Sequence, residues 1–186
     1  MSKNYLAYTL LVFATLCWSG NFIIGKFAYL FEVPPLTLNF LRWVSVWFIL
    51  IPFTYKEIYN NFQYIKKNWM VISFMGVITI STFNSVVYFA LNYTQVINAV
   101  LVLAAIPAVT IIISSLMKVD KTNIFQLIGL LLSIIGISAI ISNADINRIL
   151  SLSFNKGDIW MLVCVLSWSI YSTLLKKHSF KFSQFT

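Results

Sequence analysis

Six long apolar runs follow one another along this chain, with short polar segments between them. A helix needs about 20 apolar residues to cross the roughly 30 Å hydrocarbon core of a bilayer. The runs lack the polar–apolar alternation of a lipid-facing barrel, whereas helices satisfy their backbone groups internally. We therefore predict an all-α integral membrane protein with about six transmembrane helices. The predicted spans are Tyr5–Ile24, Leu36–Phe53, Trp69–Leu91, Val96–Met117, Ile124–Ile141 and Ile159–Leu175.

The charged residues indicate how these spans are oriented. The chain has a net charge of +8, which in a soluble domain can indicate nucleic-acid binding. Here the Lys and Arg residues lie in the gaps between apolar runs, so we predict contact with membrane lipid and no nucleic-acid partner. If the N-terminus is cytoplasmic, nine of the 13 basic residues fall on the inner side and four on the outer side. The positive-inside rule then predicts a multi-pass protein of the cell (plasma or inner) membrane with both termini in the cytoplasm.

A weak internal repeat appears when the sequence is compared with itself at an offset of 150 residues. Trp18-Ser19 then falls on Trp168-Ser169, and Lys26 falls on Lys176. The period contains five predicted spans, an odd number, so the second copy must enter the membrane from the opposite side. Inverted repeats of this kind are a common plan of secondary transporters, which hold substrate at the interface between the two halves.

The repeat divides the chain into three parts. We predict a first five-helix repeat over residues 1–141, an outer linker loop over 142–158, and the first helix and tail of a truncated second repeat over 159–186. The chain is then part of a ten-helix plan, and either a missing C-terminal half or a second copy is expected to complete the bundle.

Several motifs occur in an order that resembles the EamA-type members of the drug/metabolite transporter superfamily. WSGNFIIGK, from Trp18 to Lys26, is similar to the family's W-G-x-N-x-x-x-x-K stretch, with Ser19 where Gly is usual. Three further stretches resemble the family's second helix, its third-to-fourth helix hairpin and the start of its fifth helix. These are Pro34-Pro35 with Arg42, Phe89–Ile113 with Pro107, and DKTNIFQLIG from Asp120 to Gly129.

The resemblance covers the whole chain, since GDIWMLVCVLSWSIYSTLLKK resembles the start of the family's second repeat. It implies ten helices built as two inverted five-helix repeats, and the export or exchange of amino acids, metabolites or drugs. The expected function is therefore a permease or exporter that moves a small organic molecule by alternating access.

Arg42 is the most informative single residue, because an arginine inside a span costs about 2.5–3.5 kcal/mol on insertion scales. Arginine binds carboxylate and phosphate groups bidentately, which predicts a docking site for such a group on the substrate. A structural tie to neighbouring carbonyls or lipid headgroups is the alternative.

Other polar residues inside the runs are further candidates for substrate binding. Trp18 and Asn21 are three residues apart and share a helix face. The third span has a polar stripe of Ser81, Asn84, Ser85 and Tyr88, which should face protein or water rather than acyl chains. Together these patterns predict substrate contacts from Trp18, Asn21, Arg42, Asn84 and Tyr88, with hydrogen bonding between helices as the alternative.

Lys26 and Pro107 are candidates for gating or for a helix kink. Lys26 is expected at the outer end of its helix, where snorkelling or a helix C-terminus would also explain it. Pro107 removes the hydrogen bond from its own N–H to the carbonyl of Leu103, which would free that carbonyl or bend the helix. Asp120 with Lys121 is expected to cap or neutralise the short inner loop before the fifth span.

Catalytic chemistry has little support in this sequence. None of the five acidic residues lies inside a predicted span, and the single histidine, His178, follows the last span. We therefore predict no catalytic residue, no metal and no cofactor. Two alternatives to a transporter stay open: a truncated, non-transporting remnant or assembly partner and, less favoured, a membrane-embedded enzyme.

Overall fold

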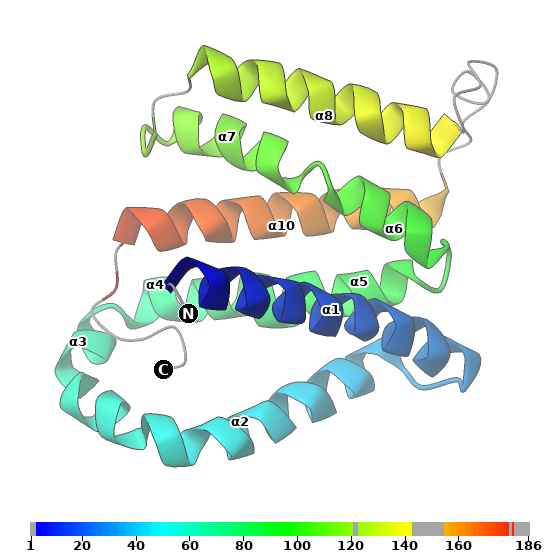
Figure 1. The fold of residues 1–186 in the computed structure, drawn as a ribbon. Coiled ribbons are helices and arrows are strands. Elements are labelled where there is room, and N and C mark those ends of the chain that lie inside the picture. Colours follow the sequence, from blue (N-terminus) through cyan, green and yellow to red (C-terminus); the bar gives the residue numbers. More distant parts are fainter. Residues whose placement is uncertain (1–2, 121–122, 143–154, 179, 181–186) are drawn as a thin grey trace.

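The chain folds into long, roughly aligned helices, and the computed structural model describes residues 3–120, 123–142, 155–178 and 180. Figure 1 shows these helices side by side. No residue within the described ranges belongs to a β-strand. The helices are α1 (Lys3–Leu30), α2 (Pro35–Asn60), α3 (Phe62–Lys67), α4 (Trp69–Gly76), the π-helix η1 (Val77–Phe83), α5 (Asn84–Ala90), α6 (Val96–Leu103), α7 (Ile106–Leu116), α8 (Ile124–Ser142) and α10 (Lys156–His178).

The lengths and surfaces of these helices fit a bilayer. Five helical segments in the described part of the chain are long and apolar enough to cross it, and α8 adds a shorter apolar stretch, Ile124–Gly136. Large apolar side chains such as Phe53 and Leu36 are 80% and 71% exposed, as they would be against acyl chains. The prediction of an all-α membrane protein is confirmed.

α1 and α2 extend well beyond their predicted spans, and α10 extends three residues past its span at each end. α1 continues past Ile24 to Leu30, and α2 continues past Phe53 to Asn60. Hydropathy marks only the part of a helix inside the hydrocarbon core, whereas the helix itself continues into the headgroup region until the chain turns. Lys26, which we expected at the end of its helix, therefore lies one turn before that end.

A tight turn places α2 beside α1. The Val33 N–H donates to the Ala28 carbonyl (2.8 Å) and the Glu32 N–H to the Tyr29 carbonyl (3.0 Å), which is the Schellman pattern of a helix end. Glu32 supplies the left-handed residue of this motif, with φ 58°. Pro35 then begins α2, a position where its missing N–H costs nothing.

The third predicted span, Trp69–Leu91, is helical but is not a single α-helix. It runs as α4, η1 and α5, and the central seven residues form a π-helix. Side-chain amides bond two of its carbonyls: Asn84 Nδ2 donates to the Thr79 carbonyl (2.7 Å) and Asn39 Nδ2 to the Ile80 carbonyl (2.8 Å). Wide turns of this kind occur often at functional sites.

The fourth span is broken rather than bent. α6 ends at Leu103, α7 begins at Ile106, and Figure 1 shows the two segments offset from each other. Pro107 lies in the first turn of α7, where proline is well tolerated. The expected irregularity at Pro107 is present, whereas its role in gating stays a prediction.

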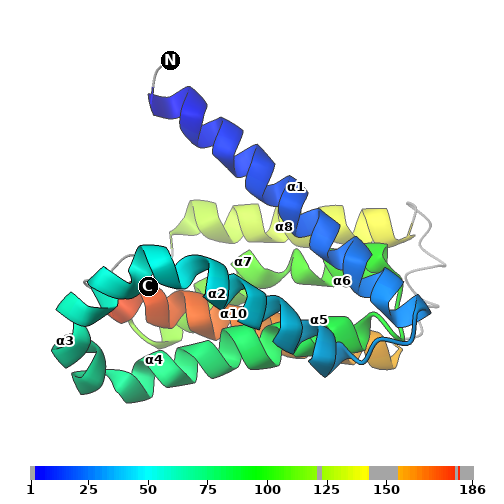
Figure 2. The ribbon, with the colours of Figure 1, turned by 90° about the horizontal axis from the view of Figure 1, so that it is seen from below.

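α10 lies at the centre of the bundle, between α6–α7 on one side and η1–α5 on the other (Figure 1). Gly157, near its N-terminus, allows this approach, because a Cβ there would lie 2.8 Å from Thr94 Cβ. The N-terminal part of α1 instead projects away from the other helices (Figure 2), and residues 5–19 are all exposed. The buried cluster consists of Phe22, Phe83, Val87, Tyr88, Ala90, Leu91, Ala99, Met161 and Cys164.

α1 and α10, the helices that the repeat pairs, run in opposite directions (Figures 1 and 2). Thr94, in the loop between α5 and α6, joins the last turns of α1 to the first turn of α10. Lys26 Nζ donates to the Thr94 carbonyl, and Thr94 Oγ1 donates to the Asp158 carboxylate. These directions agree with the inverted repeat, although the division into 1–141, 142–158 and 159–186 stays a prediction. Most of the linker, residues 143–154, lies outside the described residues.

Candidate functional site

Arg42 is the centre of a hydrogen-bond network that joins three helices. It lies seven residues into α2, about 10 Å from the start of that helix at 1.5 Å per residue. Its Nη1 donates to Asn21 Oδ1 on α1 and to the Tyr88 hydroxyl on α5, and its Nη2 donates to Asn84 Oδ1 on α5. The Tyr88 hydroxyl in turn donates to Asn21 Oδ1 at 2.6 Å. Four of the five residues predicted to bind substrate therefore meet in one place, hereafter the Arg42 network.

The local sequence explains why these four side chains can meet. Asn84 and Tyr88 are four residues apart on α5 and share one face of it. Gly25 lies one turn beyond Asn21 on α1, and a Cβ at Gly25 would come within 2.7 Å of Tyr88 Cδ1. The missing side chain therefore lets α1 approach α5 closely enough for Asn21 and Tyr88 to bond.

The charge of Arg42 has no counter-charge in the described part of the chain. Its three hydrogen-bond acceptors are all neutral, and the one salt bridge found among those residues joins Lys176 to Asp120. A guanidinium group has five N–H donors, so the three bonds of the network leave two. Aromatic rings add weaker contacts, because the guanidinium carbon lies 5.3 Å from the Trp43 ring and 5.4 Å from the Tyr88 ring. The arrangement orients a half-buried cation without neutralising it.

Lys26 bonds to the end of another helix rather than to the end of its own. Its Nζ donates to the carbonyls of Leu91 (2.7 Å) and Thr94 (3.1 Å), just after α5. It also lies 5.0 Å from the Tyr29 ring. A cation is favourable at the Leu91 carbonyl because Leu91 caps the C-terminus of α5, the negative end of the helix dipole. Lys26 thus fastens α1 to α5, and its predicted gating role stays a prediction.

Trp18 lies outside the Arg42 network. Its ring packs on that of Trp168, the residue matched to it by the repeat, at 5.4 Å between centroids. Trp168 also contacts Phe83 at 4.7 Å and Tyr171 at 5.6 Å. We call these four rings the aromatic cluster, which joins α1, η1 and α10. The sequence indicated the two tryptophans, whereas nothing in it indicated that Phe83 or Tyr171 would join them.

Asn39 is a site residue that the sequence analysis missed. It is only 6% exposed, and its Nδ2 donates to the Ile80 carbonyl and to Ser85 Oγ (2.9 Å). The available signal was an amide inside an apolar run, three residues before Arg42. The polar stripe of the third span is therefore shared between two places: Asn84 and Tyr88 reach Arg42, whereas Ser85 reaches Asn39.

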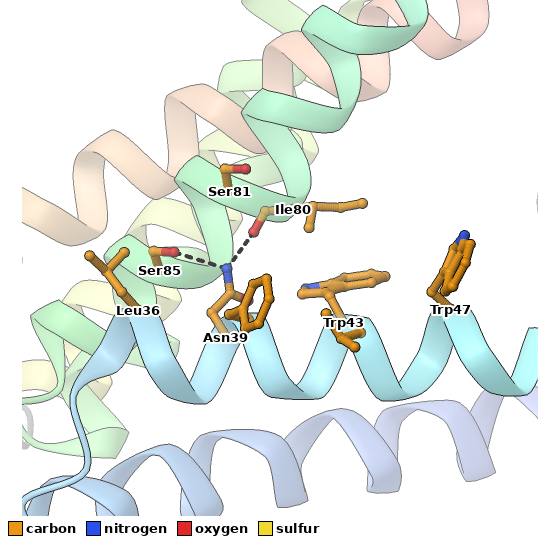
Figure 3. A pocket seen from close by; sticks show the side chains of 9 residues that line it. Leu36, Asn39, Trp43, Trp47, Ile80, Ser81 and Ser85 are labelled. Carbon is orange, nitrogen blue, oxygen red and sulfur yellow. Dashed lines mark hydrogen bonds between the residues drawn. The ribbon is translucent and has the colours of Figure 1, made fainter.

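An open groove of about 490 Å³ lies between α2 and the η1–α5 segment (Figure 3). Most of its wall is apolar, and Ser81, the remaining member of the stripe, lines it together with Ser85. Its lining residues are Leu36, Asn39, Phe40, Trp43, Val44, Trp47, Ile80, Ser81 and Ser85.

At the opposite end of the bundle, Asp120 forms a salt bridge with Lys176, 2.5 Å from Nζ to Oδ2. We had expected Asp120 and Lys121 to cap or neutralise the loop before α8. Asp120 instead ties that loop to the end of α10, and Lys121 lies outside the described residues. No group of three or more metal-ligating His, Cys, Asp or Glu side chains occurs in the residues that the structure describes.

Comparisons with known proteins point to transport. The model of the EamA-like transporter family matches residues 5–142. A Bacillus subtilis (strain 168) protein, "Uncharacterized transporter YyaM", is 23% identical over 172 residues, which cover 92% of this chain and 56% of the relative. An "Uncharacterized transporter" of Archaeoglobus fulgidus is 26% identical over 183 residues, 98% of this chain and 62% of the relative. No solved structure matches the chain significantly.

This chain thus spans somewhat more than half the length of the two curated relatives. The names of the family and of the relatives describe transporters rather than enzymes. The family match covers all of the first five predicted spans, including Asn21, Arg42, Asn84 and Tyr88. The chain belongs to the EamA-like transporter family.

Proposed function

We propose that this membrane transporter moves a small organic metabolite, such as an amino acid or a drug-like compound, and that Arg42 binds the carboxylate or phosphate group of the substrate. The observation that supports this most strongly is the guanidinium of Arg42. It has no counter-charge among the residues that the structure describes, and three neutral side chains orient it from two neighbouring helices. A purely structural arginine inside a membrane would gain more from a carboxylate partner, because the charge itself is the costly part.

An anion has two ways to bind at Arg42. It can use the two N–H groups outside the network, or it can displace a neutral acceptor such as Asn84. The bond from Arg42 to Asn84 has an ionised donor but a neutral acceptor. A carboxylate adds a full negative charge and can accept two parallel N–H bonds, so it competes well with the amide oxygen. The displaced amide stays close to the substrate, because Asn84 Nδ2 remains bonded to the Thr79 carbonyl.

The aromatic cluster offers a surface for the apolar body of the substrate. Trp18 precedes Asn21 by one helical turn, and Phe83 is the chain neighbour of Asn84, so the cluster lies next to the Arg42 network along two helices. The rings supply stacking and apolar contact, whereas the network supplies the charge. A molecule with one anionic group and an apolar body uses both.

Alternating access is supported by two irregular helices and by the directions of α1 and α10. The π-helix η1 and the break between α6 and α7 are points where a span bends at little cost. Pro107 lies beside the break, and Lys26 fastens α1 to the end of α5; these two residues are our candidates for gating. A further set of helices, from the same polypeptide or from a second copy, would cover the exposed part of α1 and close the substrate cavity.

The proposed location is the cell membrane, with both termini in the cytoplasm. This orientation puts the Arg42 network nearer the outer surface and the Asp120–Lys176 pair at the inner surface. The nine-to-four excess of basic residues on the inner side supports it.

Binding of paired ligands tests the role of Arg42. The purified chain is titrated with radiolabelled small carboxylates and phosphate esters, each paired with its uncharged methyl ester or amide. We expect at least one acid to bind about tenfold more tightly than its uncharged partner, and counterflow of that acid in proteoliposomes. Arg42→Ala should abolish the preference for the acid, and Asn84→Ala should weaken it.

Lys56→Ala is the matched control, because it removes a cation from the same helix outside the Arg42 network and should leave the preference unchanged. An acid-to-ester ratio that is the same in Arg42→Ala as in the unmodified chain would exclude Arg42 as the anion site.

A further inference from the structure

Asn39 contacts the same span that supplies two of the partners of Arg42. Its Nδ2 donates to the Ile80 carbonyl inside η1 at 2.8 Å, and to Ser85 Oγ in the first turn of α5 at 2.9 Å (Figure 3). Asn39 precedes Arg42 by about one turn of α2, so the two side chains share a face of that helix. α2 is therefore bonded to the third span at two adjacent points, one through Asn39 and one through Arg42.

The two residues that Asn39 joins are five apart, which is the spacing of one turn of π-helix. A π-turn bonds residue i to residue i+5, whereas an α-turn bonds residue i to residue i+4. Asn84 spans the same interval, because its Nδ2 donates to the Thr79 carbonyl at 2.7 Å. Two side-chain amides, one from α2 and one from the span itself, thus bridge neighbouring pairs of residues at the π spacing.

The wide turn decides which side chains of α5 face Arg42. It takes up one more residue than an α-turn, which rotates everything after it by about one residue, or about 100° at 3.6 residues per turn. If the third span were α-helical throughout and α4 kept its place, Phe83 would occupy the position of Asn84. Val87 would likewise occupy the position of Tyr88. Neither hydrocarbon side chain accepts a hydrogen bond from a guanidinium, so the partners of Arg42 on α5 depend on the wide turn.

Asn39 lies where the loss of its bonds would favour a narrower turn. It is only 6% exposed, so water does not readily replace the bonds that it makes. Without the Asn39 amide, the Ile80 carbonyl loses a donor. The backbone N–H of Asn84 can replace that donor when the turn narrows to the i to i+4 spacing.

We propose that Asn39 is a positioning residue, which holds η1 at the π spacing and thereby sets Asn84 and Tyr88 as the partners of Arg42. Its effect on anion binding rests on the function proposed for Arg42. Its effect on the register of α5 does not, and the two effects are measured separately.

Labelling from the lipid phase measures the register of α5 without any substrate. The chain is reconstituted with a phospholipid that bears a diazirine on an acyl chain, and mass spectrometry locates the adducts by residue. Phe89 is 37% exposed and Tyr88 is 2% exposed, so Phe89 should carry most of the label on these two residues. A rotation by one residue turns Tyr88 toward the place of Phe89. Asn39→Leu should therefore raise the ratio of Tyr88 to Phe89 adducts by about threefold or more.

The paired-ligand titration measures the consequence for the anion site. We expect Asn39→Leu to reduce the preference for the acid from about tenfold to about threefold or less. The double variant with Asn84→Ala should lose less than the product of the two single effects, because part of the effect of Asn39 runs through Asn84. A residue that only stabilised the fold would change neither the adduct ratio nor this coupling.

Thr54→Val is the matched control on α2. Thr54 is also 6% exposed, and its hydroxyl bonds the Leu50 carbonyl of its own helix, so its loss should leave both measurements unchanged. Ser85→Ala removes one of the two bonds of Asn39 and should shift both measurements in the same direction by a smaller amount. This milder variant decides the question if Asn39→Leu alters the helix content.

An adduct ratio that Asn39→Leu leaves unchanged, in a protein with unaltered helix content, would overturn the proposal. A changed ratio with an unchanged preference for the acid would overturn the link between the register and the anion site. If the ratio changes and the unmodified chain shows no preference for any acid, the function proposed for Arg42 fails, whereas the role of Asn39 in the register is supported.

Discussion

Gly25→Ala tests the closest helix contact in the structure, the approach of α1 to α5 beside the Arg42 network. A Cβ at Gly25 would lie 2.7 Å from Tyr88 Cδ1, 2.9 Å from Tyr88 Cε1 and 3.1 Å from Leu91 Cδ1. Ordinary van der Waals contact needs about 3.5–4.0 Å between carbon atoms, so α1 and the Tyr88 ring must separate by about 1 Å. Tyr88 is only 2% exposed, so its ring is enclosed by neighbouring side chains.

The cost of this substitution has two parts. Overpacking of a well-packed site costs about 1–3 kcal/mol. A separation of about 1 Å also breaks the 2.6 Å bond from the Tyr88 hydroxyl to Asn21 Oδ1, which adds about 1 kcal/mol. Alanine forms helices better than glycine by about 1 kcal/mol, which offsets part of this cost. We therefore expect Gly25→Ala to lower the free energy of unfolding by about 1–3 kcal/mol and to weaken binding of the acidic ligand at Arg42.

The assay is denaturation of the purified protein in mixed micelles, followed by circular dichroism, together with the paired-ligand titration. Gly20→Ala is the control on the same helix, because a Cβ at Gly20 would meet no atom within 4 Å. Alanine forms helices better than glycine by about 1 kcal/mol, so this control should be neutral or stabilising. If the two variants unfold within about 0.5 kcal/mol of each other, the reasoning about the α1–α5 contact is wrong.

Three further substitutions probe other parts of the fold. Lys26→Met removes the two bonds to carbonyls after α5 and should destabilise the protein by about 1.5–3 kcal/mol in the same denaturation assay; an unchanged midpoint would mean that Lys26 does not fasten α1. Lys118→Gly should stabilise it by about 1 kcal/mol, because Lys118 has φ 54° and glycine adopts that conformation without steric cost; a lower midpoint would contradict this. Asp120→Asn removes the exposed salt bridge to Lys176 and should cost less than about 1 kcal/mol, with a smaller effect in 1 M salt; a larger, salt-independent loss would show that the pair is structurally essential.

The network around Arg42 shows how far reasoning from single residues extends in a membrane protein. Asn21, Arg42, Asn84 and Tyr88 were selected because polar groups in lipid must face protein or water, and the structure brings these four together. Whether they bind substrate stays a prediction. Trp18 was selected with them by helical spacing, and its ring packs in the aromatic cluster instead. Spacing defines a shared helix face only approximately, and it does not define what that face meets.

The sequence by itself determined the membrane class, the number of apolar runs and the identity of the polar residues within them. These follow from hydropathy and bilayer thickness, which act on each segment separately. Only the tertiary structure decided that the third span contains a π-helix, that Asn39 and Asn84 bond its carbonyls, and that Lys26 reaches the end of α5. Those features depend on how closely helices approach and at what angle they cross, and both are set by contacts between residues that lie far apart in the chain.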